Sequence, residues 1–547
     1  MRDQFHHLFL THGVNYCRDD RPFQEMLKFL GMAPREHHDL LGAFVGEEMM
    51  EVADSIDHGA RPVLHTWGLL GERIDFVRIS PEHRRVLGHL RELRTISAGL
   101  EDAPRLWSHF LSGYLISDAG LFCTITLTMQ TAFAVWKYGD PSTKERFLSS
   151  LATDSPHGAW GATFYTEVQG GSDLGANVTV ARETPEGWRL WGPNKYFTSN
   201  VGLADVALVT AKPEPVRPGP KGIALFLVPG LRASGEPNFS LRRLKDKMGT
   251  RAVPTGEVEL EGSEAFLLGE ASHGIYTALE ILNIARVDNA LAAVGLARKA
   301  LWEAYRYAVH RQAFGKALRD HPLLRRDLWE MEAEVEVGLL LALCTARAVS
   351  ATAEDRPPYS EGYFQARLLT HLTKALTSWM SQEVTRSCLE VLGGIGFLEE
   401  FPLARLHREA LVTSIWEGTS NIQALEFLDL WNRAPVREAF WKEVLRRIQS
   451  LPVTGPTADR LRSETEELST WGRGILEDRH RGEFYAKDLL TRVGHLMASL
   501  FFLEYAHGPG GTDAARTLLD LYVARHIAHR APDVPDPRME GALEWMA

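Results

Sequence analysis

The segment from Thr163 to Asp173 carries side chains whose types and spacing could hold a flat, polar-edged ring or a phosphate. Its glycine pair, Gly170 and Gly171, leaves backbone N–H groups open beside Ser172, because glycine has no Cβ to block a close approach. The hydroxyl groups of Thr166 and Ser172 can both donate and accept hydrogen bonds. A polar hairpin loop with ordinary turn glycines is the alternative interpretation of this segment.

Two further groups of candidates follow along the chain. The segment Lys195–Asn200 places an apolar ring, Phe197, among polar neighbours, and such a ring can pack against a flat cofactor. The segment Ile415–Asn421 places Glu417 between a tryptophan and a glycine, which gives the carboxylate an aromatic wall and an unobstructed backbone N–H. Desolvation raises the pKa of such a carboxylate, which makes it a candidate general base. Taken alone, a Glu beside a Gly is more often a helix-cap carboxylate.

These pieces resemble the flavin-binding and catalytic motifs of the acyl-CoA dehydrogenase family, T-E-P-x-A-G-S-D, K-x-W-I-T-N and Y/W-E-G-T. Thr166–Asp173 stands in register with the first motif, Lys195–Asn200 with the second and Trp416–Thr419 with the third. The resemblance implies FAD as the cofactor. The residues that it places around the flavin are Thr163, Thr166, Gly171, Ser172, Phe197, Thr198, Ser199, Trp416, Thr419 and Asn421.

The same resemblance implies α,β-dehydrogenation of an acyl-CoA. Glu417 would remove the α-proton of the acyl thioester while the β-hydride moves to N5 of the flavin, and backbone and ribityl donors would stabilise the enolate oxygen. Some family members carry the base on an earlier helix, just before a characteristic arginine. Here Ala285 precedes Arg286, so that position offers no carboxylate. The expected substrate contacts are Ser172, Arg286 and Trp416, and a helix-surface charge is the alternative role for Arg286.

Two more segments, His310–Gly315 and Glu390–Phe397, resemble the family segments that hold the dinucleotide half of FAD. In the family these segments reach the cofactor of a neighbouring subunit. The resemblance therefore implies a homo-oligomer, a tetramer built as a dimer of dimers. The expected cofactor contacts in these segments are Arg311, which would neutralise pyrophosphate, Phe314, Glu390, Gly393 and Gly394.

Four departures from the catabolic enzymes point to the AidB-like branch of the family, which is linked to the adaptive response to alkylation. Val168-Gln-Gly replaces Pro-x-Ala, Phe197 replaces a tryptophan, Glu390 replaces a glutamine, and an extra segment follows Trp431. This branch implies a second function, that of a flavoprotein that binds DNA or sequesters acyl-CoA with little turnover. The extra segment holds 16 Lys and Arg against 17 Asp and Glu, so nucleic acid is weakly supported as a partner. Oxidation of a small molecule other than an acyl-CoA is a third alternative.

Apolar spacing predicts the elements that must position these residues. Helical spacing from Pro22 to about Ser155 is followed by short runs bounded by Gly and Pro, which are typical of strands. Helical spacing then returns at Gly274, in a long helix that ends near Gly315 and in two helices separated by a loop at 354–360. The predicted strands cover Trp188–Trp191, Asp205–Lys212, Gly222–Pro229 and Gly256–Glu261.

This order of elements predicts an α+β protein with separate helical and sheet domains. It matches the acyl-CoA dehydrogenase fold with an additional helical domain. The predicted domains are an N-terminal α-helical domain at 1–156, a middle β-barrel-like domain at 157–272, a C-terminal four-helix bundle at 273–430 and an additional helical C-terminal domain at 431–547.

Composition excludes some classes of protein. The net charge of −11 argues against a general nucleic-acid binder. No stretch approaches the roughly 20 apolar residues of a membrane span, the segment Cys123–Tyr138 is typical of a buried helix, and the start lacks a signal-peptide pattern. No membrane partner and no metal site are therefore expected. The four cysteines are expected to be reduced, buried thiols in a cytoplasmic protein. The sequence does not identify the electron acceptor.

Overall fold

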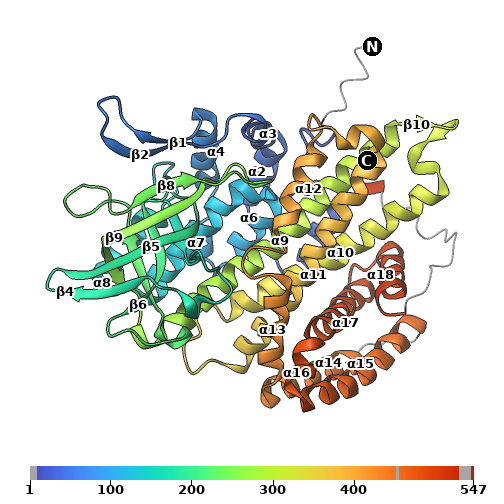
Figure 1. The fold of residues 1–547 in the computed structure, drawn as a ribbon. Helices are drawn as coiled ribbons and strands as arrows, with labels where there is room; N and C mark the ends of the chain where they lie inside the picture. Colours follow the sequence, from blue (N-terminus) through green and yellow to red (C-terminus); the bar gives the residue numbers. More distant parts are fainter. Residues whose placement is uncertain (1–8, 451–454, 529–543, 547) are drawn as a thin grey trace, which may run out of the picture. The chain divides into compact units, whose positions relative to one another are not determined.

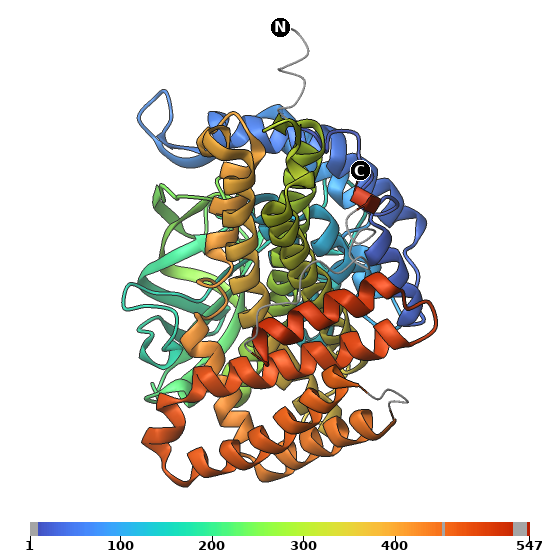
Figure 2. The same cartoon turned by 90° about the vertical axis from the view of Figure 1, so that its right-hand side faces the viewer.

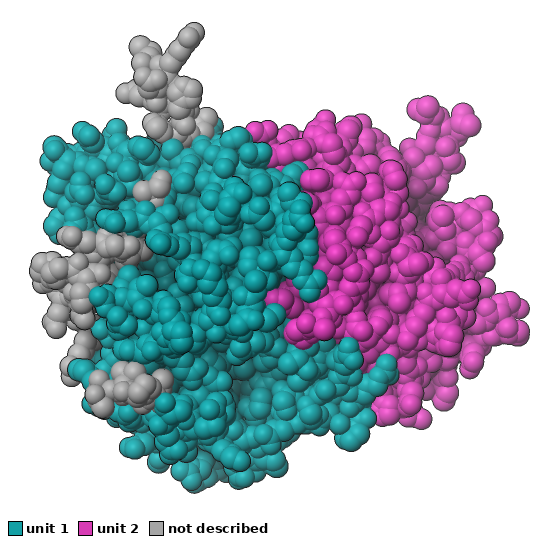
Figure 3. Space-filling model, turned by 180° about the vertical axis from the view of Figure 1, so that it is seen from behind, with its two compact units in different colours: residues 1–47, 110–117, 286–547 teal, residues 48–109, 118–285 magenta. Residues whose placement is uncertain are grey.

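A computed structural model describes residues 9–450, 455–528 and 544–546 of the chain. The chain folds into two compact units, which Figure 3 colours separately. Unit 1 comprises residues 1–47, 110–117 and 286–547, and unit 2 comprises residues 48–109 and 118–285. The four domains expected along the sequence stay a prediction, because the spatial units combine segments that are far apart in the chain.

Unit 2 contains a seven-stranded sheet with the strand order β3-β5-β4-β6-β7-β9-β8. Two additional pairings, β3 with β6 and β5 with β9, join strands across this order, which gives the sheet a barrel-like closure. The pairings of β6 with β3 and with β4 are parallel and the other pairings are antiparallel. The strands are β3 (Gly161–Phe164), β4 (Val180–Thr184), β5 (Gly187–Ser199), β6 (Val206–Pro213), β7 (Ala224–Pro229), β8 (Ser240–Leu244) and β9 (Thr255–Leu267).

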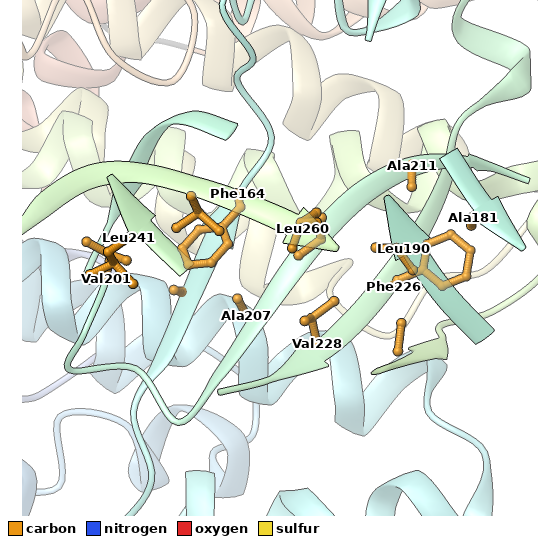
Figure 4. Close-up of a cluster of buried hydrophobic side chains, with 14 of the residues drawn as sticks. Phe164, Ala181, Leu190, Val201, Ala207, Ala211, Phe226, Val228, Leu241 and Leu260 are labelled. Atoms are coloured by element: carbon orange, nitrogen blue, oxygen red, sulfur yellow. The ribbon is translucent and has the colours of Figure 1, made fainter. Parts of the chain in front are cut away.

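The sheet of unit 2 encloses an apolar core. Strand β7 is buried at every residue and β6 at nearly every residue, so both faces of these strands are covered. Figure 4 shows side chains of this core, among them Phe164, Leu190, Phe226, Val228 and Leu260. All the strands predicted from the sequence are confirmed, although β5 and β9 extend well beyond the predicted runs.

The helix α7 (Ala119–Tyr138) packs against β3 and α8 in unit 2. It begins where the Asp118 carboxylate accepts a hydrogen bond from the backbone N–H of Leu121, and it is therefore longer than the predicted segment Cys123–Tyr138. By length and composition α7 could cross a membrane, which corrects the expectation that no stretch is long enough. However, 94% of its apolar window is buried inside the protein, as in a core helix. The other helices of this unit are α3 (Met50–His58), α4 (Pro81–Glu92), α5 (Ser97–Glu101) and α8 (Pro141–Leu151).

A β-hairpin interrupts the N-terminal region, which was expected to be helical. Strands β1 (Val63–Trp67) and β2 (Arg73–Arg78) pair antiparallel and project from unit 2 in Figure 1. Exposed and half-buried residues alternate along β1, the period of two that marks a strand. The prediction missed this short alternation because helical spacing surrounds it on both sides.

Unit 1 is a helical assembly around α11 (Glu361–Leu392), which packs against α10 (Pro322–Ala351), α12 (Pro402–Val412) and α13 (Ser420–Trp431). The loop predicted at 354–360 separates α10 from α11, as expected. The long helix α9 (Gly274–His310) begins in unit 2 and continues into unit 1. The N-terminal helices of unit 1 are α1 (Arg21–Phe29), α2 (Glu36–Phe44) and most of α6 (Trp107–Ile116).

Helix α9 ends at His310 rather than near Gly315. A small hairpin follows, with β10 (Gln312–Ala313) paired to β11 (Lys316–Ala317). Phe314 and Gly315 form its turn, and both have positive φ, of 50° and 81°. Two successive residues with positive φ are characteristic of the tight turns that join paired strands, and they cannot continue a right-handed helix.

The segment beyond Trp431 is helical, as predicted. Its long helix α17 (Ala486–His507) packs against α10, α11 and α13 of the same unit, and Figure 2 shows this helix lying across them. The predicted end of the helical pattern, His529, lies outside the described residues. The other helices of the segment are α14 (Ala434–Ser450), α15 (Pro456–Gly474), α16 (Arg479–Phe484) and α18 (Asp513–His526).

Candidate functional site

A buried ion pair ties the loop after β3 to strand β5 in unit 2. The Glu167 carboxylate lies 2.9 Å from Lys195 Nζ, and both side chains are 2% exposed or less. Glu167 also accepts hydrogen bonds from the backbone N–H of Val178 and from the Thr179 hydroxyl, at 2.7 and 2.6 Å. Burial alone would raise the pKa of Glu167, but Lys195 and these hydrogen bonds lower it. The Glu of the first motif and the Lys of the second therefore have a structural role, because the pair fixes the loop on the strand.

Three of the predicted flavin contacts share one face of the sheet. Thr163 is paired with Ser199 across β3 and β5, so their side chains point to the same side. At the end of β5 the exposed Phe197 and the half-buried Ser199 flank the buried Thr198, so Phe197 lies on the same side as Ser199, and it is 51% exposed. Thr198 points the other way, is buried, and donates its hydroxyl to a backbone carbonyl of β9 at 2.8 Å. The structure thus brings Thr163, Phe197 and Ser199 together and uses the Thr198 hydroxyl inside the sheet.

One position of the loop after β3 is crowded by a neighbouring side chain. A Cβ at Gly171 would lie 2.4 Å from Thr166 Oγ1, far inside ordinary contact distance. Gly171 and Ser172 are exposed and Thr166 is half-buried, so the backbone here is open to a bound molecule. The exposed backbone of this loop fits the close approach of a polar ring edge, which the sequence predicts for this segment.

The candidate base lies on an unusual turn in unit 1, between α12 and α13. Glu417 has φ of 56° and Gly418 has φ of 93°. Left-handed backbone is uncommon for a residue with a side chain, and it persists only where the surroundings impose it. The carbonyl oxygens of both residues receive hydrogen bonds from buried side chains, which supply this constraint.

Three side chains from three helices bind these two carbonyl groups. Arg286 Nε, on α9, donates to the Glu417 carbonyl at 3.0 Å. Lys374 Nζ, on α11, donates to the Gly418 carbonyl at 2.7 Å. Gln423 Nε2, on α13, donates to both carbonyls, at 3.0 and 3.1 Å. The turn is therefore held by donors that are far apart in the sequence.

Each nitrogen of the Arg286 guanidinium has a hydrogen-bond partner within the protein. Besides the Glu417 carbonyl it binds the Glu426 carboxylate through both terminal nitrogens, at 2.8 and 2.6 Å. Burial would raise the pKa of Glu426, but Arg286 and these hydrogen bonds lower it to about 2. This two-pronged pair is geometrically specific. The structure assigns Arg286 to the support of the turn, and its contact with substrate stays a prediction.

The charges around Glu417 are suited to a proton acceptor. Burial raises the pKa of Glu417 to about 7, while Arg286 and Lys374 act to lower it and Asp288 acts to raise it. Burial also lowers the pKa of Lys374 to about 7, Arg286 contributes to this lowering and Glu417 opposes it. A carboxyl group that titrates near neutral pH can accept a proton from a weak acid and release it again.

The neighbours of Glu417 in the motif have different environments. Trp416 is half-buried and its indole N–H donates to the side-chain oxygen of Asn289 on α9. Thr419 is exposed and stands at the start of α13 without a side-chain capping bond. Asn421, in the first turn of α13, is also exposed. The structure leaves both side chains accessible and fixes the ring of Trp416.

The residues predicted to serve a neighbouring subunit lie on the surface of unit 1. Phe314, in the β10–β11 turn, is 97% exposed, and Arg311 is exposed beside it. Glu390 is exposed and pairs with Arg386 one turn earlier on α11. Gly393, which has φ of 67°, and Gly394 are exposed, and a Cβ at either one would meet open space. Their contact with a cofactor stays a prediction.

Sequence reasoning missed the polar residues that support the turn. The missed residues on α11 are Lys374 and His371, three residues apart, and those on α13 are Gln423 and Glu426, also three apart. This spacing places each pair on one face of its helix. A histidine and a lysine among the leucines of the segment 368–376 were the available signal, because such residues are rarely buried without a partner.

The cysteines of the chain lie outside the site described above. The four cysteines, Cys17, Cys123, Cys344 and Cys388, are buried and free, as expected. Within residues 9–450, 455–528 and 544–546, no group of three or more His, Cys, Asp or Glu side chains could hold a metal ion.

Three family models match the chain in succession. The Adaptive response protein AidB N-terminal domain matches residues 10–155. The Acyl-CoA dehydrogenase middle domain matches residues 162–263, and the Acyl-CoA dehydrogenase C-terminal domain matches residues 272–427, which include Glu417. The helices from α14 onward lie beyond these matches.

Individual proteins show the same likeness. The putative acyl-CoA dehydrogenase AidB of Escherichia coli (strain K12) is 31% identical over 420 residues, 72% of this chain and 74% of its own length. The solved apo form of Bd2924 is 28% identical with a TM-score of 0.80, over 90% of this chain and 98% of that one. The structure of Caenorhabditis elegans ACDH-11 in complex with C11-CoA has the same fold, at 22% identity and a TM-score of 0.80, over 97% of this chain and 92% of that one.

Proposed function

The chain belongs to the acyl-CoA dehydrogenase family, in its AidB-like branch, and we propose that it is an FAD-dependent oxidoreductase that dehydrogenates an acyl-CoA between its α and β carbons. The observation that carries this proposal is Glu417, a carboxyl group with a pKa of about 7 on a turn that three buried side chains hold in a left-handed conformation. This is the environment that a base for a weak carbon acid requires.

The described residues fit FAD in their chemistry. In unit 2 an exposed aromatic face, Phe197, stands on the same side of the sheet as the hydroxyls of Thr163 and Ser199. The Gly171 and Ser172 backbone is exposed for close approach to a polar ring edge. These features suit an isoalloxazine, which is flat, apolar on its faces and polar along its edge.

The proposed reaction removes two hydrogens from the substrate. FAD, when bound, supplies the two-electron acceptor for the β-hydride. Glu417 takes the α-proton, so the α C–H bond breaks and its electron pair forms the new carbon–carbon double bond. Backbone N–H donors near the turn stabilise the negative charge that develops on the thioester oxygen. Glu417 then releases the proton to solvent, as a group with a pKa of about 7 does readily.

The test of this function is an anaerobic titration of the purified flavoprotein with acyl-CoAs of increasing chain length and branching. Bleaching of the oxidised flavin band by one chain class is the expected result, and it would identify the substrate class. A flavin spectrum that no acyl-CoA changes would overturn the proposal and favour sequestration of acyl-CoA or the alkylation response instead.

Charge pairing on the C-terminal segment does not favour DNA binding as a second function. Arg447 lies 2.6 Å from Glu504, and Arg492 lies 2.8 Å from Glu464, so acids already neutralise these cations. We expect a labelled DNA duplex to bind weakly, with little dependence on salt. Affinity that falls steeply as salt rises would support a DNA-binding role instead. Further arginines with acidic partners in or beside this segment are Arg433, Arg446, Arg462, Arg479, Arg516 and Arg525.

We further propose that the active form is a homo-oligomer, most simply a tetramer. Phe314 and Phe397 are 97% and 91% exposed on unit 1, in the two segments that resemble subunit-bridging segments of the family. Contact with a neighbouring subunit through these segments would cover both rings. Light scattering of the flavoprotein should therefore give a multiple of 61.3 kDa, and a mass of one chain at micromolar concentration would contradict this.

A further inference from the structure

We infer that Lys374 and the Gln423–His371 pair are positioning residues, which hold the Glu417–Gly418 turn from behind, and that the Lys374 ammonium also stabilises the ionised form of Glu417. The role in catalysis rests on the proposed function. The role in holding the turn is a property of the chain itself and can be tested without a substrate.

Buried donors fix the orientation of the two carbonyl groups of the turn. The carbonyl groups of Glu417 and Gly418 both point at buried donors. The donor residues, each 1% exposed or less, are Arg286, Lys374 and Gln423. Buried carbonyl oxygens need such donors, and buried donors equally need acceptors. With both carbonyls held inward, the backbone adopts positive φ at both residues, and the direction of the Glu417 side chain is fixed as a consequence.

A hydrogen bond with His371 orients the side-chain amide of Gln423. Its side-chain nitrogen donates to both carbonyls, so its side-chain oxygen must act as an acceptor. His371 Nδ1 lies 2.9 Å from that oxygen and therefore carries the proton. Burial lowers the pKa of His371 to about 3, which keeps the ring neutral. His371 thus selects the one amide orientation of Gln423 that can support the turn.

The charge of Lys374 depends on its burial and on the charged groups around it. Its side chain is fully buried, and an ammonium in such a place is costly unless a carboxylate offsets it. The charged groups that act on it are Arg286, which repels it, and Glu417, which attracts it. Ionised Glu417 therefore stabilises charged Lys374, and the reverse holds equally. The other charged groups that act on this pair are Arg286 and Asp288, both on α9.

The sign of the effect follows from this coupling. Removal of the Lys374 charge destabilises ionised Glu417 and raises its pKa. The rate of flavin reduction should then need a higher pH, with its acidic limb moved upward by about one pH unit, the lower end of the effect of a nearby opposite charge. Removal of the neutral Gln423 support should loosen the turn and lower the rate without this displacement of the limb.

The experiment compares three variants with two matched controls. Lys374→Met removes the donor and the charge, Lys374→Arg keeps the charge, and Gln423→Leu removes the neutral donor. The controls have the same chemistry elsewhere in unit 1. Lys299→Met removes a buried lysine that donates to the Ile116 carbonyl at 2.5 Å. Gln365→Leu removes an amide that donates to the Val436 carbonyl at 2.8 Å.

The first readout is amide hydrogen exchange of the peptide that covers residues 414–423, without substrate. We expect faster exchange in Lys374→Met and Gln423→Leu and unchanged exchange in both controls. The second readout is the pH profile of flavin reduction, in which only Lys374→Met should move the acidic limb and Lys374→Arg should restore it. Unchanged exchange in both variants would overturn the positioning role, and an unmoved limb in Lys374→Met would overturn the charge role.

The proposed function and the positioning role can fail separately. If no acyl-CoA reduces the flavin of the unaltered protein, the proposed function is wrong, while hydrogen exchange still decides the positioning role. The charge role is then decided by the upper pH limit at which the stability difference caused by Glu417→Gln stops growing, because this limit follows the pKa of Glu417 in the folded protein. Lys374→Met should move this pH upward by about one unit, and an unmoved value would contradict the coupling.

Discussion

Replacement of Glu417 by glutamine removes one carboxyl group and keeps the backbone contacts of its turn, because Arg286 and Gln423 bind the Glu417 carbonyl rather than its side chain. The substitution therefore isolates the ionisation of this group. Burial raises the pKa of Glu417 from its ordinary value of 4.5 to about 7 in the folded protein. Ionisation is thus less favourable in the folded chain than in the unfolded chain.

The pH dependence follows from this difference. Between pH 4.5 and about 7 the folded protein holds a proton that the unfolded chain has lost, so the contribution of Glu417 to stability declines as pH rises through this window. The full displacement of the pKa corresponds to about 3 kcal/mol. Relative to the unaltered protein, Glu417→Gln should therefore become more stable by up to about 3 kcal/mol between pH 4.5 and about pH 8.

Denaturant unfolding of both proteins at several pH values measures this difference. Glu438→Gln provides the control, because it removes an exposed carboxylate on α14 in the same unit. The stability difference between this variant and the unaltered protein should not vary across the window. A Glu417→Gln difference that is equally flat would refute the reasoning. Glu417 would then be hydrated in the folded protein, and the environment assigned to the base would be wrong.

Three other substitutions test separate parts of the structure. Glu167→Gln leaves buried Lys195 without its carboxylate and should lower the free energy of unfolding by about 3–5 kcal/mol, measured by denaturant unfolding. Gly171→Ala places a Cβ against Thr166, so the purified protein should carry less flavin, measured as the ratio of absorbance at the flavin and protein bands. Deletion of residues 544–547 removes the backbone carbonyl of Met546 that accepts bonds from two α9 side chains, and should cost roughly 2–4 kcal/mol in stability.

Controls for these changes are available in the same chain. Glu183→Gln removes an exposed carboxylate on β4 and should leave stability nearly unchanged. Gly474→Ala adds a Cβ that meets open space and should leave the flavin content unchanged. Equal losses in a test variant and its control would contradict the specific contact concerned. Unchanged stability after the deletion would show that the Met546 contacts are not needed.

The strands and helices that were predicted correctly have strong local signals. The runs that became β6 and β7 are apolar along their length and bounded by Gly and Pro, and they are buried on both faces. The helix α7 is apolar on all sides and is buried almost throughout. In these segments the local pattern and the surrounding packing demand the same structure.

The elements that were missed depend on weaker signals. The β1–β2 hairpin is short and largely exposed. Its alternating side chains therefore do not form a buried apolar face that would distinguish it from the helices around it. The end of α9 was placed too late because the turn at Phe314 depends on positive φ, which its sequence alone does not require. Positive φ at Phe314 is a property of the hairpin rather than of the residue.

Part of the candidate site could be predicted and part could not. Glu417 and the glycine-containing loop stand in short motifs whose chemistry is local. The support of the turn depends on Arg286, Lys374 and Glu426, which are far apart in the sequence and meet only in the folded bundle. Arg286 was expected near a substrate, and its pairing with Glu426 could not be inferred without knowing which helix faces of α9 and α13 meet.

The central claim is that Glu417 takes the α-proton of an acyl-CoA. Its most direct test is the rate of flavin reduction in a single anaerobic turnover, measured for the unaltered protein and for Glu417→Gln with the acyl-CoA that bleaches the flavin best. Both proteins should carry flavin with the same spectrum, and the variant should react about 1,000 times more slowly. Reduction of the variant at the rate of the unaltered protein would contradict the assignment of the base.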